Sequence, residues 1–352
     1  LWSVTRQPTR RRPQEPEVKV YPHRVEFSRV DDEIYLKTDV TVAPEDDVEI
    51  RRVTVTNRSG RERRLTLTSY GEVVLAPQNA DRGHPAFNKM FVESEYLSEH
   101  NALLFRRRPR SSEEAPWYLA HALVVQGRLE ETGAYETDRA RFLGRGQTVR
   151  APDALTGETA ALSGTTGATL DPIMALGQTV TLSPHRSAEL AYVTVAATSR
   201  EAAVEVVAQY RYWSRLQRAF DKATSSSEIE LSTLGATVDD VQRFQQLLSA
   251  LRYPHPALRA SSQTLAENVL DQSGLWPHAI SGDYPILLVR VSQEEDLALV
   301  RQVLQAHRYW RHRRVKTDLV ILNEKDVGYA EDLQDRLGQL LHQTDNDAWR
   351  SR

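Results

Sequence analysis

Three arginines in one short segment are the residues best suited to binding chemistry. Residues 135–146 hold Arg139, Arg141 and Arg145 together with two acids and two glycines. A glycine lets the backbone approach a ligand closely, and an arginine can form paired hydrogen bonds with sugar hydroxyls, carboxylates or phosphate. We therefore predict these arginines on the ligand side of a binding loop. The alternative is a loop held in place by ion pairs between Asp138 and its neighbouring arginines.

A second candidate binding segment begins at His84. Residues 84–89 combine this histidine with the aromatic ring of Phe87 and the amide of Asn88, and they follow Asp81 in a predicted long loop. Such a set could form a sugar subsite, with the ring stacked on a pyranose face. The alternative is a loop packed on its own domain. A second histidine at metal-ligand spacing is missing, so we predict no metal site here.

Other motifs favour structural roles. The turn at 280–283 precedes a strand, whereas phosphate-binding loops follow a strand and open a helix. His307 and His312 are five residues apart and lack a third ligand, so we interpret them as part of a solvated helix end. A nucleotide-binding tail would need a glycine-rich loop after Val291, which is missing. We predict no catalytic residue, metal or cofactor within this chain.

Composition excludes several classes of protein. Of 352 residues, 40% are hydrophobic and 26% charged, which is typical of folded soluble domains. A net charge of -3 argues against nucleic-acid binding, and the absence of cysteine excludes disulfides and thiolate chemistry. Apolar runs are too short for a bilayer span, so we expect a soluble chain without membrane contact. Because the chain begins at Leu1 without Met and ends in a polar tail, we expect a piece of a longer polypeptide.

The element pattern is mainly β, followed by helices. Residues 1–17 are basic and Pro-rich and read as an extended leader, with a solvated tail favoured over a polyanion-binding arm. Residues 18–198 alternate apolar and polar side chains and predict a large antiparallel β-sandwich. Within them, residues 57–60 predict a hairpin turn between two strands.

The later part of the chain changes period. Residues 199–270 predict a helical linker: Ser199 can cap a helix running through Ala203 to Phe220, and a second helix over 238–251 ends before Pro254. Residues 271–352 predict a small α/β segment. It consists of two apolar strands around one amphipathic helix, a βαβ unit buried on both faces, and then a further helix.

Ordered blocks over nearly the whole chain resemble one family, the cyclic β-1,2-glucan synthases. The resemblance concerns their part homologous to glycoside hydrolase family 94 phosphorylases, formerly glycosyltransferase family 36. The blocks that carry it are residues 67–75, 84–87, 106–110, 135–139, 142–146, 170–173, 272–276, 280–286 and 318–324.

The resemblance implies a galactose-mutarotase-like supersandwich and linker helices that support an (α/α)6 barrel. In the family, an Asp of that barrel protonates the glycosidic oxygen while inorganic phosphate, a co-substrate, attacks the opposite face of the sugar with inversion. This chain ends before any such barrel, so no catalytic residue is carried over.

We therefore expect a non-catalytic carbohydrate-binding or scaffold portion of a synthase. Its expected partners are β-1,2-glucan, the parent's remaining domains and a second copy in a homodimer. The implied location of the parent is the cytoplasmic face of the inner membrane. The alternatives are a stand-alone carbohydrate-binding module, or the same portion of a soluble β-1,2-oligoglucan phosphorylase.

Overall fold

The chain divides into two units, Leu1–Ser227 and Glu228–Arg352, and each is treated by itself. The computed structural model describes residues 1–109, 111, 114–127, 133–157, 160–253, 255–324 and 330–343. Several residues on which the sequence analysis relied lie outside these ranges: Arg110, Pro254, and residues 325–329 and 344–352.

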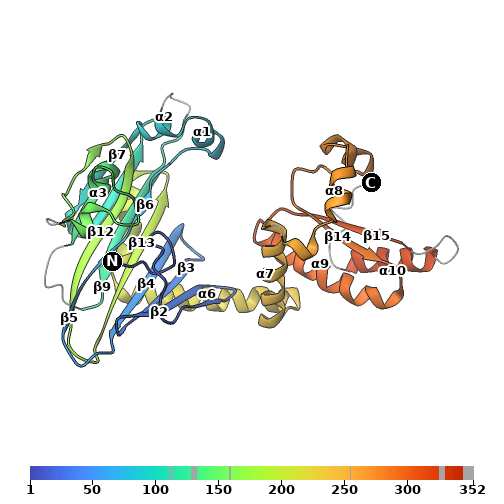
Figure 1. Cartoon of the computed structure of the whole chain (residues 1–352), viewed down its shortest axis with the longest axis horizontal. Coiled ribbons are helices and arrows are strands. Elements are labelled where there is room, and N and C mark those ends of the chain that lie inside the picture. Colours follow the sequence, from blue (N-terminus) through green and yellow to red (C-terminus); the bar gives the residue numbers. More distant parts are fainter. Residues whose placement is uncertain are drawn as a thin grey trace. The chain divides into compact units, whose positions relative to one another are not determined.

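A nine-stranded antiparallel sheet is the main feature of the first unit (Figure 1). Its strands, in spatial order, are β1 (Glu17–Val20), β2 (Val25–Asp31), β3 (Ile34–Val42), β4 (Val48–Asn57), β13 (Ser187–Ala197), β9 (Tyr118–Val125), β8 (Ala102–Arg107), β7 (Val92–Leu97) and β11 (Gly167–Ala168). A smaller antiparallel sheet contains β10 (Ala134–Asp138), β12 (Pro172–Leu182) and β5 (Arg63–Thr68), with β6 (Gly71–Glu72) also paired to β12. The predicted antiparallel sandwich is confirmed.

The sandwich core lies between the two sheets. Leu36 and Phe105 on the large sheet belong to the same buried apolar cluster as Leu176 and Leu182 on the small one. Strand side chains alternate between faces, so the period of two in the sequence places one apolar row inward on each sheet. The apolar area that leaves water on this contact is the main force holding the sheets together.

Helices cover the opposite face of the large sheet. Val207 of α5 (Arg200–Tyr210) and Leu216 of α6 (Trp213–Leu234) pack in one buried cluster with residues of β4, β9 and β13. The Ser199 side chain accepts a hydrogen bond from Ala202 N at 3.1 Å, which confirms the predicted N-cap. The prediction of one continuous helix is wrong, because the chain leaves the helix between α5 and α6.

The predicted hairpin at residues 57–60 is also wrong. The strands on either side, β4 and β5, belong to different sheets, so this turn carries the chain across the sandwich. The reason is visible at Asn57, which is fully buried. Its side-chain amide donates to the carbonyl oxygens of Arg61, Leu182 and Ser183 at 2.7, 3.1 and 3.2 Å and ties the crossing to the end of β12.

The leader is not a solvated tail. Trp2 and Val4 pack against the core between the sheets. Arg29, buried beneath them, places its guanidinium 5.1 Å from the Trp2 ring and donates hydrogen bonds to the carbonyl oxygens of Ser3 and Thr5. Two apolar side chains are enough to anchor a short segment. The basic, Pro-rich composition of the leader therefore did not reveal this docking.

Short helices connect the strands of the first unit. They are α1 (Gln78–Gly83), α2 (Pro85–Lys89), α3 (Arg139–Leu143), α4 (Asp153–Thr156) and a 3-10 helix (Ser98–His100). The segment predicted as a long loop around His84 is therefore α1 and α2, with His84 at their junction. Figure 1 shows both helices beyond the end of β7.

The second unit is helical with a parallel strand pair. Its elements are α7 (Val238–Arg252), α8 (Ser262–Glu267), β14 (Ile286–Val291), α9 (Leu297–His312), β15 (Asp318–Asn323) and α10 (Ala330–Gln343), with 3-10 helices at Pro256–Leu258, Gln272–His278 and Glu294–Asp296. Strands β14 and β15 pair in parallel, with Ile286 opposite Asp318, so the predicted βαβ unit and its following helix are confirmed.

The expectation that both faces of this strand pair are buried is wrong. Val289 and Val291 pack with residues of α9 and α10 in one buried cluster. Ile286, Leu288 and Leu322 remain exposed among the described residues. Helices α9 and α10 both pack on the same face of the strand pair, so they leave the other face uncovered.

Candidate functional site

Side chains from four separate segments meet at one end of the small sheet. Pairing of β12 with β6 sets Ile173 opposite Glu72, so Asp171, just before β12, lies near β6. Arg139 begins α3 directly after β10, and its backbone N–H donates to Asp171 O at 3.1 Å. Lys89 reaches the same place from the end of α2. We call Tyr70, Glu72, Lys89, Arg139 and Asp171 the edge cluster.

Hydrogen bonds and ion pairs join all five members of the edge cluster. Lys89 Nζ lies 2.6 Å from Asp171 Oδ1 and 3.5 Å from Glu72 Oε2. Arg139 Nε lies 3.2 Å from Glu72 Oε1, and its Nη1 lies 3.5 Å from Asp171 Oδ2. Arg139 also donates to the Tyr70 hydroxyl at 3.1 Å. Of these side chains, Glu72, Arg139 and Asp171 are partly exposed and could bind hydroxyls.

Electrostatics keep the cations of the edge cluster charged. Burial lowers the pKa of Lys89, but the hydrogen bond and charge of Asp171, aided by Glu72, outweigh it and leave the pKa raised. The hydrogen bond with Tyr70 is the main reason that the pKa of Arg139 is raised. Burial raises the pKa of the Tyr70 phenol, so Tyr70 stays protonated at neutral pH. None of these groups is poised to exchange a proton near pH 7.

The predicted site residues fall on two neighbouring segments. His84 is exposed at the junction of α1 and α2, where Asn88 Nδ2 donates to its carbonyl oxygen at 3.0 Å. Arg139 lies in the edge cluster beside Lys89, which closes the helix that His84 precedes. Arg141 and Arg145 are exposed on α3 and the following turn, outside the cluster. Their role toward a ligand stays a prediction.

In the segment 135–146, the structure explains why a glycine stands at position 144. Gly144 adopts a φ of +80°, and a Cβ added there would lie 1.9 Å from Asp153 Oδ2. Phe142 is buried, with its ring 5.2 Å from that of Tyr70. Asp138 caps α3 by accepting from Ala140 N at 2.8 Å. The close approach that Gly144 permits is thus to the chain's own α4. Asp138 Oδ2 also lies 4.0 Å from Arg141 Nε, an ion pair of the kind that the loop-fixing alternative expected.

Four members of the edge cluster were missed by reasoning on residue spacing. Tyr70, Glu72, Lys89 and Asp171 come from segments that are far apart in the sequence, and only the fold brings them together. A partial signal existed, since Tyr70, Glu72 and Asp171 lie in blocks that carry the family resemblance. Local spacing could not find them, because residues 70–72, Lys89 and Asp171 come together only in the fold.

Two sites weighed in the second unit have structural explanations. In the turn at 280–283, Gly282 has a φ of +73° and Gln272 Nε2 donates to Ser281 O at 2.8 Å. After β14, Asp296 Oδ2 accepts from the backbone N–H groups of Ser292 and Gln293 at 2.9 and 3.1 Å. These hydrogen bonds also lower the pKa of Asp296. The Asp296 carboxylate therefore already occupies the backbone N–H groups that a phosphate would need.

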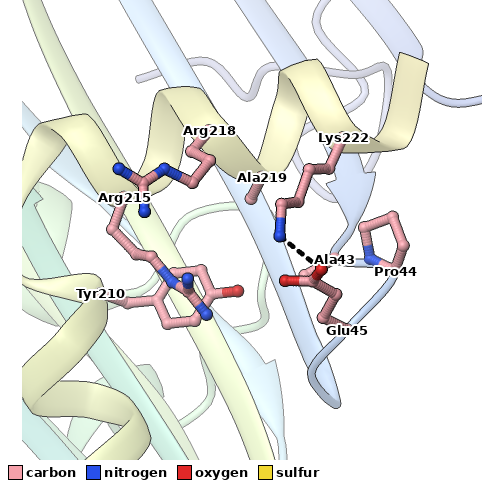
Figure 2. Close-up of a pocket in the computed structure, with 8 residues that line it drawn as sticks. All are labelled: Ala43, Pro44, Glu45, Tyr210, Arg215, Arg218, Ala219 and Lys222. Carbon is pink, nitrogen blue, oxygen red and sulfur yellow. Dashed lines mark hydrogen bonds and ion pairs between the residues drawn. The ribbon is translucent and has the colours of Figure 1, made fainter. Parts of the chain in front are cut away.

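A small pocket of the first unit lies under α6. Figure 2 shows it between the β3–β4 turn and the helices, lined by Ala43, Pro44, Glu45, Tyr210, Arg215, Arg218, Ala219 and Lys222. Its volume of about 10 Å³ suits one water molecule, so it cannot hold a sugar. Tyr210 donates to Asp46 Oδ2 at 2.7 Å and Arg215 to the same oxygen at 2.8 Å. The pocket belongs to the contact that holds α5 and α6 against the large sheet.

Within the described ranges, His, Asp and Glu side chains nowhere gather in a group of three or more that could hold a metal ion. A helix both long and apolar enough to cross a bilayer is likewise missing from the part of the chain that the structure describes.

Two solved structures illustrate the similarity found by comparison of folds. A bacterial glucoamylase complexed with acarbose is 10% identical, with 60% of this chain and 29% of that chain covered and a TM-score of 0.39. A polysaccharide lyase is 11% identical, with 52% and 23% covered and a TM-score of 0.32. Scores this low support no conclusion about this chain.

Sequence comparison is decisive. The family model for "Glycosyl hydrolase 94, supersandwich domain" matches residues 1–212. The cyclic beta-(1,2)-glucan synthase NdvB of Rhizobium meliloti (strain 1021) is 34% identical over 339 residues, which is 96% of this chain but 12% of that protein. The resemblance seen in the sequence is therefore confirmed, and the chain belongs to the glycosyl hydrolase 94 supersandwich family.

Proposed function

We propose that this chain is a non-catalytic, carbohydrate-binding and supporting portion of a protein that acts on β-1,2-glucan. Membership of a glycosyl hydrolase family supports a carbohydrate-related role, and the name of the 34% identical relative suggests the glucan. The observation that carries the proposal is the edge cluster, where Glu72, Lys89, Arg139 and Asp171 hold one another half-exposed on rigid strand and helix ends. Preorganised polar groups of this kind suit neutral hydroxyls.

The family resemblance supports a binding role over a catalytic one. An inverting reaction needs a carboxylic acid that protonates the leaving oxygen. The resemblance implies that this acid belongs to an (α/α)6 barrel, and we assign the proton donor and the phosphate site to such a barrel elsewhere in the parent.

The proposal also includes the residues that face the ligand, the partners of this chain and the location of the parent. We place His84, Arg141 and Arg145 at the rim of the glucan site, together with Arg139 of the edge cluster. The remaining domains of the parent are the permanent partners, and a homodimer through this chain is part of the proposal. The parent is proposed to act at the cytoplasmic face of the inner membrane, with no membrane contact by this portion.

A titration and an activity assay test this function together. The full chain should bind β-1,2-linked glucooligosaccharides in calorimetry, and it should release no glucose 1-phosphate from them in the presence of inorganic phosphate. Arg139→Ala should weaken binding about tenfold, equivalent to about 1.4 kcal/mol. The matched control is Arg290→Ala, another arginine paired with a glutamate, which belongs to the second unit.

Two outcomes would contradict the proposal. Release of glucose 1-phosphate by the pure chain would refute the non-catalytic assignment. Equal binding of β-1,2-linked and β-1,4-linked oligosaccharides would refute the substrate class while leaving carbohydrate binding intact.

A further inference from the structure

Four neighbouring strands of the large sheet share one margin, next to the edge cluster. They are β11, β7, β8 and β9, and the ladder pairs that define the margin are Ala168–Glu93, Val92–Arg107 and Arg106–Tyr118. Residues just beyond these pairs gather at the same end of the sheet: Leu170 after β11, Met90 before β7 and Trp117 before β9. Figure 1 shows α2 beyond this end of β7.

Large apolar side chains are exposed along this margin. The exposed fractions are 51% for Trp117, 51% for Met90, 79% for Leu170 and 46% for Phe87 on α2. We call these four residues the apolar rim. A single exposed hydrophobic residue needs no explanation, but a group of them bordered by polar side chains marks an interaction site.

The backbone beneath the apolar rim is firmly held. Arg107, which is buried, donates through its backbone N–H to Trp117 O at 3.2 Å and through Nη2 to Asn88 Oδ1 at 3.3 Å. Asn88 is buried too and donates to Ala80 O at 2.7 Å, which fixes α2. The exposed rings therefore stand on a backbone that hydrogen bonds hold in place.

The charged side chains described around the apolar rim lie in ion pairs. Arg106 and Arg108 share Glu93, at 3.0 and 3.1 Å, and Lys89 pairs with Asp171 at 2.6 Å. Paired charges still present donors and acceptors to a neutral ligand. A stable protein partner would need roughly 800 Å² per side, far more than four side chains supply.

We propose that the apolar rim is a stacking platform for neutral pyranose rings, with Trp117 and Phe87 under the C–H faces of two sugar units. The edge cluster, linked to the rim through Lys89, would then contact their hydroxyls. Aromatic faces pack well against the apolar face of a ring while the polar neighbours bind its edge. This inference rests on the proposed carbohydrate binding and names the residues that carry it.

The test is a titration of the full chain with β-1,2-linked glucooligosaccharides, followed by calorimetry and by tryptophan fluorescence. Trp117→Ala and Phe87→Ala should each weaken binding by about fivefold or more. Trp117→Phe, which keeps an aromatic face, should retain most of the affinity. The matched controls are Tyr212→Ala and Trp276→Ala, exposed aromatic residues outside the rim, which should bind like the unaltered chain.

The outcomes separate this inference from the function on which it rests. If the unaltered chain binds and Trp117→Ala binds equally well with an unchanged melting temperature, the platform is refuted and carbohydrate binding stands. If the unaltered chain binds no glucan at millimolar concentrations, binding and platform both fall. Loss of affinity in Trp117→Ala that Trp117→Phe restores supports the platform against a general loss of structure.

Discussion

His121 shows how a single side chain links the two sheets. It lies buried on β9, with Nε2 2.9 Å from Ser69 Oγ and Nδ1 3.0 Å from Thr194 Oγ1. Its ring is stacked on Tyr192 at 5.8 Å. Burial, together with the charge of Arg51, lowers the pKa of His121 to about 3, so the ring stays neutral in the folded chain. Ser69 directly precedes Tyr70, so His121 also supports the edge cluster.

The first residue-scale prediction concerns pH. The unfolded chain protonates this histidine near its ordinary pKa of about 6.5, whereas the folded chain does so only near pH 3. Between these values the unfolded state binds more protons, so the free energy of unfolding should fall as the pH drops below 6.5. The slope from one group is at most about 1.4 kcal/mol per pH unit.

Urea unfolding at several pH values between 5 and 8 checks this. His121→Asn should be less stable at pH 8, by about 1 to 3 kcal/mol, because Ser69 or Thr194 loses a buried partner. It should also show a shallower loss of stability toward acid. The exposed His185→Asn is the control and should keep the slope of the unaltered chain; a parallel slope in His121→Asn would contradict the assignment.

At the scale of elements, the crossing from β4 to β5 decides the topology. The side chain of Asn57 supplies hydrogen bonds that the two strands of a hairpin would otherwise make with each other. Its amide donates to three carbonyl groups, and its Oδ1 accepts from Ser59 N at 3.0 Å and Ser59 Oγ at 2.6 Å. A buried side chain with every polar atom used holds a connection in one geometry. The strands on either side can then enter separate sheets.

This connection should be sensitive to substitution. Asn57→Ala leaves several buried polar groups unpaired, so we expect a loss of at least about 2 kcal/mol in the free energy of unfolding. The neighbouring Ser187→Ala removes an exposed hydrogen bond to Thr56 and should cost no more than about 0.5 kcal/mol. Chemical denaturation followed by circular dichroism measures both, and equal stability of the two variants would count against the role of Asn57.

At the scale of the whole molecule, the first unit extends past the family match. The model of the family ends at residue 212, while the unit continues to Ser227. The added part of α6 buries Leu216 and Phe220 on the large sheet. It also brings Arg215 to Asp46 at 2.8 Å and pairs Lys222 with Glu45 at the pocket of Figure 2.

A fragment of residues 1–227 should therefore fold by itself, with a β-rich spectrum and one cooperative melting transition. A fragment of residues 1–212 should melt at a lower temperature or aggregate, because it exposes the surface that Leu216 and Phe220 cover, each worth about 1.5 to 3 kcal/mol. Calorimetry of the two fragments decides. Identical melting temperatures would show that α6 adds nothing to this unit.

The sequence by itself determined the classes of element and much of their order. Alternation of apolar residues predicted the strands of the sandwich, helical periodicity predicted α7 and α9, and Ser199 marked a helix start. The parallel pairing of β14 with β15 followed from two apolar runs around one helix. These signals are local, since each lies within one continuous stretch of the sequence.

Only the tertiary structure decided what depends on distant contacts. Residues 57–60 carry a turn signal in either a hairpin or a crossing, and buried contacts to Leu182 and Ser183 select the crossing. The leader docks because Trp2 packs against the core and against the guanidinium of Arg29. Likewise Tyr70, Glu72, Lys89 and Asp171 meet Arg139 through strand pairing across the sheet. Hydrogen bonds and burial between segments far apart in the chain cannot be read from spacing, so the site emerged only with the fold.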